Sequence, residues 1–140
     1  MSSDRIFQIT KDIDAMARTI WGEARGETED GRLAVGHVIK NRADRGGWWG
    51  DTIYEVCHAP WQFSCWNEID PNRSKMLLLT GKDEMFVECI WTALSVILGK
   101  HKDNTSGSCH YHVVGLTPDW SEGKTSIGRI GHHEFYNDID

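Results

Sequence analysis

A glutamate lies on the apolar side of the first helical pattern, close to where that pattern ends. Glu23 follows Ile20 by three positions and Met16 by seven, so its side chain points the way those residues point. A carboxylate that faces a core is unfavourable to ionise, and we expect its pKa to rise. The apolar stripe itself has helical spacing and consists of Ile13, Met16, Ala17, Ile20 and Ala24.

This placement gives Glu23 a candidate chemical role. A carboxyl group that stays partly protonated near neutral pH can act as a general acid. Spacing alone leaves a plainer alternative open, in which Glu23 forms an ion pair with Arg25 or Arg32. Glu27 falls four residues further on, on the same side, at or just past the helix end. Both carboxylates are therefore candidates for one site.

The composition predicts one soluble domain that spans residues 1–140. A hydrophobic content of 39% and a charged content of 26% are ordinary for a globular protein. The net charge is −6 and no basic run occurs, which argues against nucleic acid as a partner. Residues 1–11 lack the apolar segment of a secretory signal, and no stretch is long enough to span a membrane. We therefore expect a chain made in the cytoplasm, and nothing in the sequence demands more than a monomer.

Cysteine and tryptophan usage adds two expectations. Without a secretory signal, the cysteines are expected to be free thiols, with one or two disulfides as the alternative if the protein later leaves the cell. Their spacing matches no zinc finger or ribbon. Seven tryptophans are many for this length, and exposed rings suit stacking on sugars, although the core is the alternative for each ring. The cysteines are Cys57, Cys65, Cys89 and Cys109.

The remaining patterns predict a mostly helical α+β domain with a small β element. We expect Thr10 to cap the first helix, and Gly22 and Gly26 to end it. Residues 58–71 are irregular and aromatic, which is typical of a binding loop. Further helices are predicted over 28–42, 52–57 and 82–98, the last as the central buried helix, and strands within 109–116 and 133–136.

Six short stretches, taken in order, carry a family resemblance. They are ARTIWGEARGE (17–27), GRLAVGHVIKNR (31–42), WQFSCWN (61–67), GSCHYH (107–112), PDW (118–120) and IGRIGHHEFY (127–136). Together they resemble the cell-wall hydrolase family of the spore-cortex-lytic enzymes and related phage endolysins. The resemblance implies a lysozyme-like, lytic transglycosylase-like domain that cleaves peptidoglycan glycan strands. The family's catalytic acid is the first glutamate of EARGE, which maps onto Glu23.

The resemblance also implies the chemistry, which needs no cofactor. Glu23 would protonate the leaving oxygen of the β-1,4 bond from N-acetylmuramic acid to N-acetylglucosamine. In a lytic transglycosylase the same glutamate then takes the proton of the muramic acid C6 hydroxyl, which leaves a 1,6-anhydro end. The alternative is a hydrolytic muramidase that uses Glu27 as a second carboxylate. Glu68 and Glu134 are weaker candidates for that second role.

Two segments are expected to form the walls of a substrate groove. The first segment is 62–66 and the second is 110–112. Side-chain amides and hydroxyls bind sugar groups, and aromatic rings stack on them. Segment 62–66 could equally anchor the irregular loop 58–71 to the core. On a strand, Tyr111 faces opposite to His110 and His112, so only one of these faces meets the groove. The resemblance favours Tyr111 as the residue that orients sugar or Glu23, whereas Trp120 is expected in packing. The groove candidates are Gln62, Phe63, Ser64, Trp66, His110 and Tyr111.

Histidines leave a rival class open, a zinc amidase that removes the peptide from muramic acid. His110 and His112 share one side of a predicted strand, and His132 and His133 lie downstream. A catalytic zinc site needs three protein ligands and an open position, but the chain has no HExxH motif. We therefore expect no metal, and activity in a chelator distinguishes the two classes.

The resemblance suggests a setting as well. Spore enzymes of this kind usually carry a signal peptide and a separate wall-binding domain, and neither is visible here. The bare domain is therefore similar to a phage or prophage lysis enzyme, which reaches the wall after release from the cytoplasm.

Overall fold

The structure is a computed structural model that describes residues 2–139. Within this range a mostly helical body is followed by a small antiparallel sheet, so the predicted fold class is confirmed. The helices are α1 (Ser3–Ala24), α2 (Glu29–Arg45), α3 (Ile53–His58), α4 (Pro71–Leu77) and α5 (Glu84–Ile97). Short 3-10 turns are η1 (Gly47–Trp49), η2 (Ser64–Trp66) and η3 (Asp119–Ser121), and the strands are β1 (His110–Val113), β2 (Gly128–Ile130) and β3 (His133–Tyr136).

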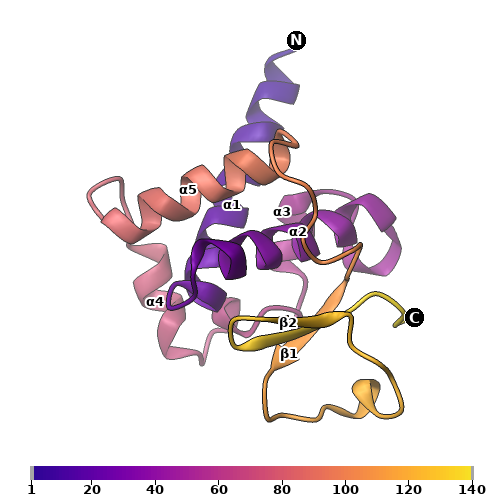
Figure 1. Cartoon of the computed structure of the whole chain (residues 1–140). Coiled ribbons are helices and arrows are strands. Elements are labelled where there is room, and N and C mark those ends of the chain that lie inside the picture. The colour runs from indigo at the N-terminus through magenta and orange to yellow at the C-terminus, as the bar shows by residue number, and fades with distance from the viewer. Residues whose placement is uncertain (1, 140) are drawn as a thin grey trace.

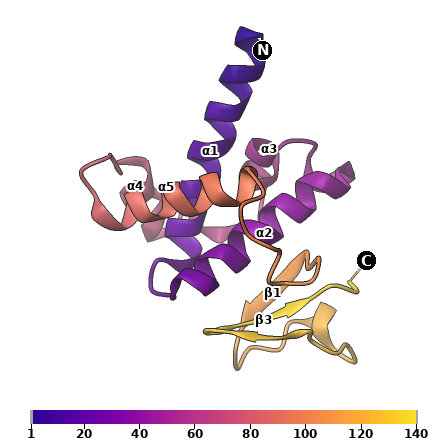
Figure 2. The ribbon, with the colours of Figure 1, turned by 45° about the horizontal axis from the view of Figure 1, so that its top comes forward.

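The start of α1 differs from the prediction, since Thr10 does not cap this helix. The helix begins at Ser3, and the Ser2 hydroxyl accepts a hydrogen bond from a main-chain N–H of the first turn. Thr10 lies within the helix and donates to the Ile6 carbonyl (2.9 Å). The first turns project beyond the helical body (Figure 2). Because they bury little, the apolar stripe that starts at Ile13 does not mark where the helix begins.

The end of α1 also corrects a prediction, because Gly22 lies inside the helix rather than ending it. A Cβ atom on Gly22 would lie 2.7 Å from Cβ and 2.8 Å from Sγ of Cys65. Any larger residue would therefore push η2 away from α1. Gly22 thus permits the close approach that brings Cys65 beside Glu23.

The core forms around α1, which packs against α2, α3, α4 and α5. Figure 1 shows α5 crossing α1, with the sheet at the lower end of the helical body. A Cβ on Gly36 of α2 would lie 3.1 Å from Val96, so a glycine lets α2 and α5 pack closely. The prediction that 82–98 forms the central helix is wrong, because α5 covers one side of the core and leaves Trp91 63% exposed.

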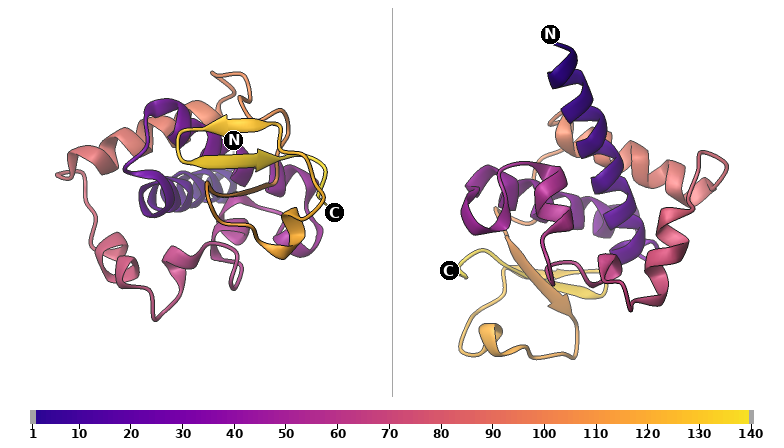
Figure 3. Two further views of the ribbon diagram at one scale, coloured as in Figure 1. Left: turned by 60° about the horizontal axis from the view of Figure 1, so that its bottom comes forward. Right: turned by 180° about the vertical axis from the view of Figure 1, so that it is seen from behind.

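The sheet has the strand order β1–β3–β2, and all pairs are antiparallel. Figure 3 shows it at the end of the molecule opposite the start of α1. Phe135 of β3 packs against Ala34 and Val38 of α2, which defines an inner face that carries Tyr111 as well. The outer face carries the alternate residues, such as His112. The strands at 110–113 and 133–136 confirm the prediction, whereas β2 and α4 were not predicted.

The four cysteines are separate buried thiols, as predicted. Burial raises the pKa of Cys57 to about 12 and that of Cys89 to about 11, so both thiols stay protonated at neutral pH. Among residues 2–139, no helix has the length and apolar character needed to cross a membrane.

Candidate active site

Glu23 lies in the last turn of α1, where three elements meet. The Tyr111 hydroxyl, from the inner face of β1, donates a hydrogen bond to Glu23 Oε1 (2.5 Å). The Cys65 thiol of η2 is a second donor to the same carboxylate. Burial raises the pKa of Glu23, and the two hydrogen bonds offset only part of this rise. The site therefore holds a carboxyl group that retains its proton at a higher pH than usual.

Tyr111 is held firmly on this inner face. Its ring contacts the rings of His133 (4.9 Å between centroids) and Phe135 (5.6 Å). Burial and the nearby Glu23 carboxylate raise the pKa of Tyr111 well above its ordinary value. Its hydroxyl is thus a hydrogen-bond donor at any working pH, and it favours the ionised form of Glu23.

Arg42 is a functional candidate that the sequence reasoning missed. Its side chain is buried (7% exposed), and Nε donates to the Cys109 carbonyl (2.8 Å). The guanidinium charge favours an ionised Glu23 and so lowers the pKa of that group. A signal was present, because Arg42 follows Val38 by four positions and Val35 by seven, so it points toward the core, where a charge has to face a partner.

The aromatic loop places its predicted wall residues at different depths. Phe63 is 2% exposed and packs in the core beneath Arg42, so the expectation that it contacts substrate is corrected. Gln62 is half-buried with its side-chain oxygen 3.5 Å from Arg42 Nη1, and Ser64 is exposed. The Trp66 indole N–H donates to the Thr19 hydroxyl (2.8 Å), which fixes the ring at the surface of α1.

A pocket of about 440 Å³ adjoins Trp66, and Trp61 forms its outer side. Trp61 is 77% exposed and has a positive φ of 64°, which bulky residues rarely adopt. Such strain is found where a side chain is held for a function. Sequence reasoning did not select Trp61, because neither exposure nor strain is visible in a motif. The lining consists of Pro60, Trp61, Trp66, Asn67, Glu68 and Ile69.

Glu27 is bound to the sheet and not to Arg25. Its side chain is 6% exposed, and both oxygens are engaged by His132, through the main-chain N–H (2.7 Å) and through Nδ1 (2.6 Å). Burial alone would raise the pKa of Glu27, but the contacts with His132 lower it overall. A Cβ on Gly131 would lie 2.8 Å from Glu27 Oε1, so the turn is shaped around this carboxylate. Glu27 therefore joins the α1–α2 turn to the β2–β3 turn.

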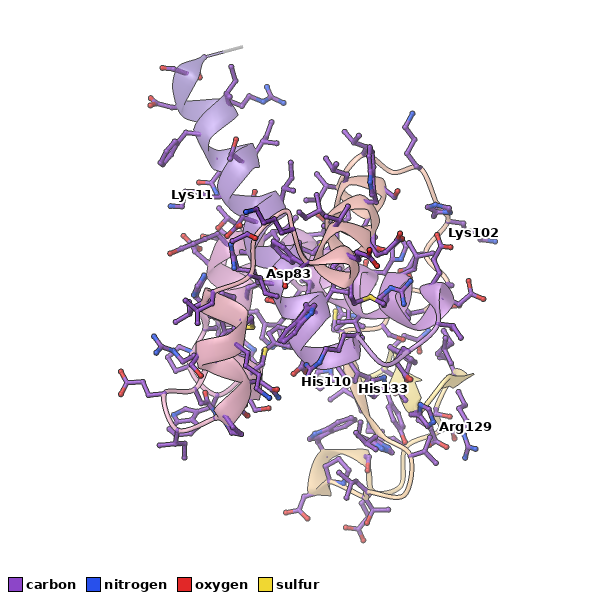
Figure 4. All side chains as sticks on the ribbon, turned by 90° about the vertical axis from the view of Figure 1, so that its left-hand side faces the viewer. Lys11, Asp83, Lys102, His110, Arg129 and His133 are labelled. Carbon is purple, nitrogen blue, oxygen red and sulfur yellow. The ribbon has the colours of Figure 1, made fainter. Side chains whose placement is uncertain are left out.

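The predicted histidines do not gather at one point. His110 lies on the outer face between Trp49 and Trp120, where burial lowers its pKa to about 4. His110 and Tyr111 thus lie on opposite faces of β1, as strand alternation predicts, and of these two groove candidates only Tyr111 reaches Glu23. His133 lies on the inner face (Figure 4), and His132 binds Glu27. Among residues 2–139, no group of three or more His, Cys, Asp or Glu side chains is arranged to hold a metal ion.

The other predicted residues of the sheet also lie on its outer face. Glu134 pairs there with His112 and Arg129 across the strands, away from the inner face that carries Tyr111. Trp120 packs edge-on against the Tyr136 ring, which agrees with the packing role expected for it. The inner face thus contributes Tyr111 alone from the predicted groove residues.

A helical body with a small sheet at one end, and with a buried glutamate where the first helix ends, is a lysozyme-like fold. The chain belongs to the cell wall hydrolase family, whose model matches residues 26–136. The predicted family resemblance is therefore confirmed. The matched range contains Glu27 but begins after Glu23. A role for Glu23 is therefore argued from its contacts and burial, and not from the family model.

Two solved structures are similar in fold and in sequence. The catalytic domain of the Bacillus cereus SleB protein superimposes with a TM-score of 0.72 at 28% identity, over 90% of this chain and 89% of that chain. The catalytic domain of the germination-specific lytic transglycosylase SleB from Bacillus anthracis superimposes with a TM-score of 0.70 at 28% identity, over 89% of this chain and 93% of that chain. A spore cortex-lytic enzyme of Halalkalibacterium halodurans is 30% identical over 127 residues. That match covers 90% of this chain but only 34% of the relative, so the chain spans about a third of that protein.

Proposed function

We propose that this chain cleaves peptidoglycan glycan strands at the β-1,4 bond from N-acetylmuramic acid to N-acetylglucosamine, as a lytic transglycosylase. The observation that carries the proposal is the buried Glu23 carboxyl group, held by Tyr111 and Cys65. Its raised pKa suits a general acid. The names of the similar SleB domain and spore cortex-lytic enzyme support the substrate class.

In this mechanism one carboxyl group acts twice. Protonated Glu23 donates its proton to the leaving glycosidic oxygen while the anomeric carbon gains positive charge. The resulting carboxylate is stabilised by the Tyr111 hydroxyl and by the charge of Arg42. It then accepts the proton of the muramic acid C6 hydroxyl as that oxygen attacks the anomeric carbon. Glu23 is left protonated for the next cycle, and no water is consumed.

The contacts of Glu27 weigh against the hydrolytic alternative. A second catalytic carboxylate would have to face water or the sugar, whereas both Glu27 oxygens are bound to His132. The zinc amidase is less well supported, because His110 and His112 lie on the outer face and His133 lies on the inner face. The geometry thus favours a mechanism with one carboxyl group.

Mass spectrometry of digested peptidoglycan tests the proposal. We expect muropeptides with 1,6-anhydro-muramic ends, formed at the same rate with and without a chelator. Reducing-end muramic acid would instead indicate a muramidase, and free stem peptides would indicate an amidase.

Tyr111→Phe is expected to move the alkaline limb of the pH–rate profile to higher pH. The hydroxyl lowers the pKa of Glu23, so its removal raises that pKa further and extends the range in which the acid is protonated. The measurement is kcat/KM against pH, with Tyr54→Phe on α3 as the control. An unchanged alkaline limb would show that this hydrogen bond does not act on Glu23.

Trp61→Ala is expected to raise KM about tenfold, roughly 1.4 kcal/mol of binding, with little change in kcat. The exposed ring, at the edge of the pocket beside Trp66, offers a flat apolar surface on which a sugar ring can stack. Trp91→Ala is the matched control, since Trp91 is also exposed but lies on α5, outside the pocket. Equal effects of the two substitutions would argue against a sugar subsite at Trp61.

Phage or prophage lysis is the setting that we propose, and the sequence resemblance to endolysins supports it. Spore cortex is the alternative, which the names of the relatives support. Faster cleavage of vegetative walls than of purified cortex would favour the phage setting.

A further inference from the structure

A hollow of about 760 Å³ lies on the outer face of the sheet, which is the face turned away from Tyr111 and Glu23. It is larger than the pocket at Trp61, and no step of the proposed cleavage uses it. A loop that leaves β1 and contains η3 forms the opposite wall. The lining of the hollow includes His112, Leu116, Glu122, Arg129, Glu134 and Tyr136.

A row of charged and polar side chains crosses the floor of this hollow. Glu134 of β3 is paired with Arg129 of β2 on one side and with His112 of β1 on the other. Glu134 Oε1 lies 3.6 Å from Arg129 Nη2, and Oε2 lies 3.9 Å from His112 Nε2. His112 Nε2 is also 2.9 Å from the Tyr136 hydroxyl. A hydrogen bond therefore holds the His112 end of the row, whereas Arg129 is joined to the row through a longer ion pair.

The two ends of the row differ in their access to solvent. The side chain of His112 is 8% exposed, that of Glu134 is 29% exposed and that of Arg129 is 59% exposed. Figure 4 shows Arg129 at the edge of the sheet, directed away from the helices. Glu122 adds a carboxylate and Leu116 an apolar surface on the opposite wall. The hollow therefore offers one open cationic group, two carboxylates and an apolar side.

We propose that this hollow binds the short peptide attached to muramic acid. The inference rests on the proposed function, and it names the part of the substrate that the outer face recognises. A wall peptide carries free carboxylates, which suit Arg129, and an amino group, which suits Glu122 or Glu134. The volume is within the range of small-ligand sites, which is about 300–1,000 Å³.

The path from the reacting bond to the hollow is short. The edge strand β1 presents Tyr111 on the inner face and His112 on the outer face. A peptide on a sugar beside Tyr111 therefore has only one strand to pass. Three to five extended residues reach roughly 10–17 Å, about the spacing between packed sheets and enough to pass around one edge.

Charge reversal at Arg129 tests the proposal on two forms of one substrate. Glycan strands that carry peptides are compared with the same strands after an amidase has removed the peptides. We expect Arg129→Glu to lower the ratio of kcat/KM for the two forms at least fivefold. Lys102→Glu, an equal charge change in the loop after α5, is the control for general repulsion and should leave the ratio at its wild-type value. An unchanged ratio in Arg129→Glu, or an equal fall in both variants, would overturn the proposal.

A binding measurement separates this proposal from the proposed function. Free stem tripeptide is titrated into the Glu23→Gln protein, with backbone amide shifts followed by NMR. Shifts confined to 112–123 and 129–136, and lost in Glu23→Gln with Arg129→Glu, would support the hollow even if no glycan cleavage were found. Glycan cleavage by the parent together with no shifts in this region would leave the proposed function intact and refute the peptide site.

Discussion

Glu23→Gln is expected to lower the rate of glycan cleavage by about a thousandfold or more. General acid catalysis contributes roughly 10²–10⁴-fold, and here one carboxyl group would serve both proton transfers. Glutamine has nearly the same shape, and its side-chain oxygen can still accept the Tyr111 hydrogen bond (2.5 Å in the parent). The measurement is the rate of soluble muropeptide release, with Glu88→Gln on the exposed side of α5 as the control.

The same substitution should leave the protein as stable as the parent, or more stable, at pH 7. Folding raises the pKa of Glu23 above its ordinary value of 4.5, so the folded state holds this proton more tightly than the unfolded state. The parent therefore loses stability as pH rises from 4.5 through the pKa of Glu23 in the folded state. The Glu23→Gln variant has no such loss, because glutamine does not ionise. Thermal unfolding at pH 4 and pH 7 checks the sign. Loss of both activity and stability would make Glu23 a structural residue instead.

The sequence could predict which way Glu23 and Tyr111 point, because periodicity records burial along a single element. Helical spacing placed Glu23 with the apolar stripe, and strand alternation set Tyr111 opposite to His110. Their direct hydrogen bond (2.5 Å) is a long-range contact, which no local pattern specifies. The resemblance to a family, rather than spacing, brought these two residues together.

Gly22 and Phe63 show why other predictions failed. Glycine is a poor helix former, so Gly22 was expected to end α1, but the close approach of Cys65 outweighs that preference. Phe63 lies in an irregular loop, where burial depends on which surface the loop meets. That surface includes Arg42, from a helix far away in the sequence. In both cases contacts between elements decide the outcome.

The proposed anchoring role of Glu27 predicts different results for two substitutions. Glu27→Ala should lower the free energy of unfolding by about 1–3 kcal/mol, because it removes the two charge-assisted hydrogen bonds that join the carboxylate to the His132 main-chain N–H and Nδ1. Cleavage should fall with it, since the β2–β3 turn is then released from α1 and the sheet carries Tyr111. Glu27→Gln should keep most of the stability and most of the cleavage rate, because an amide can accept from the His132 N–H and donate to His132 Nδ1.

The pH dependence of this stability has the opposite sign to that of Glu23. Folding lowers the pKa of Glu27 below 4.5, so its contribution is full at neutral pH and is lost as pH falls from 4.5 through the folded pKa. Urea unfolding of the parent and Glu27→Ala should therefore differ at pH 7 and converge in acid. A Glu27→Gln protein that is as stable as the parent but as inactive as Glu23→Gln would contradict the anchoring role. Two carboxylates would then be needed, and the expected product would change to reducing-end muramic acid.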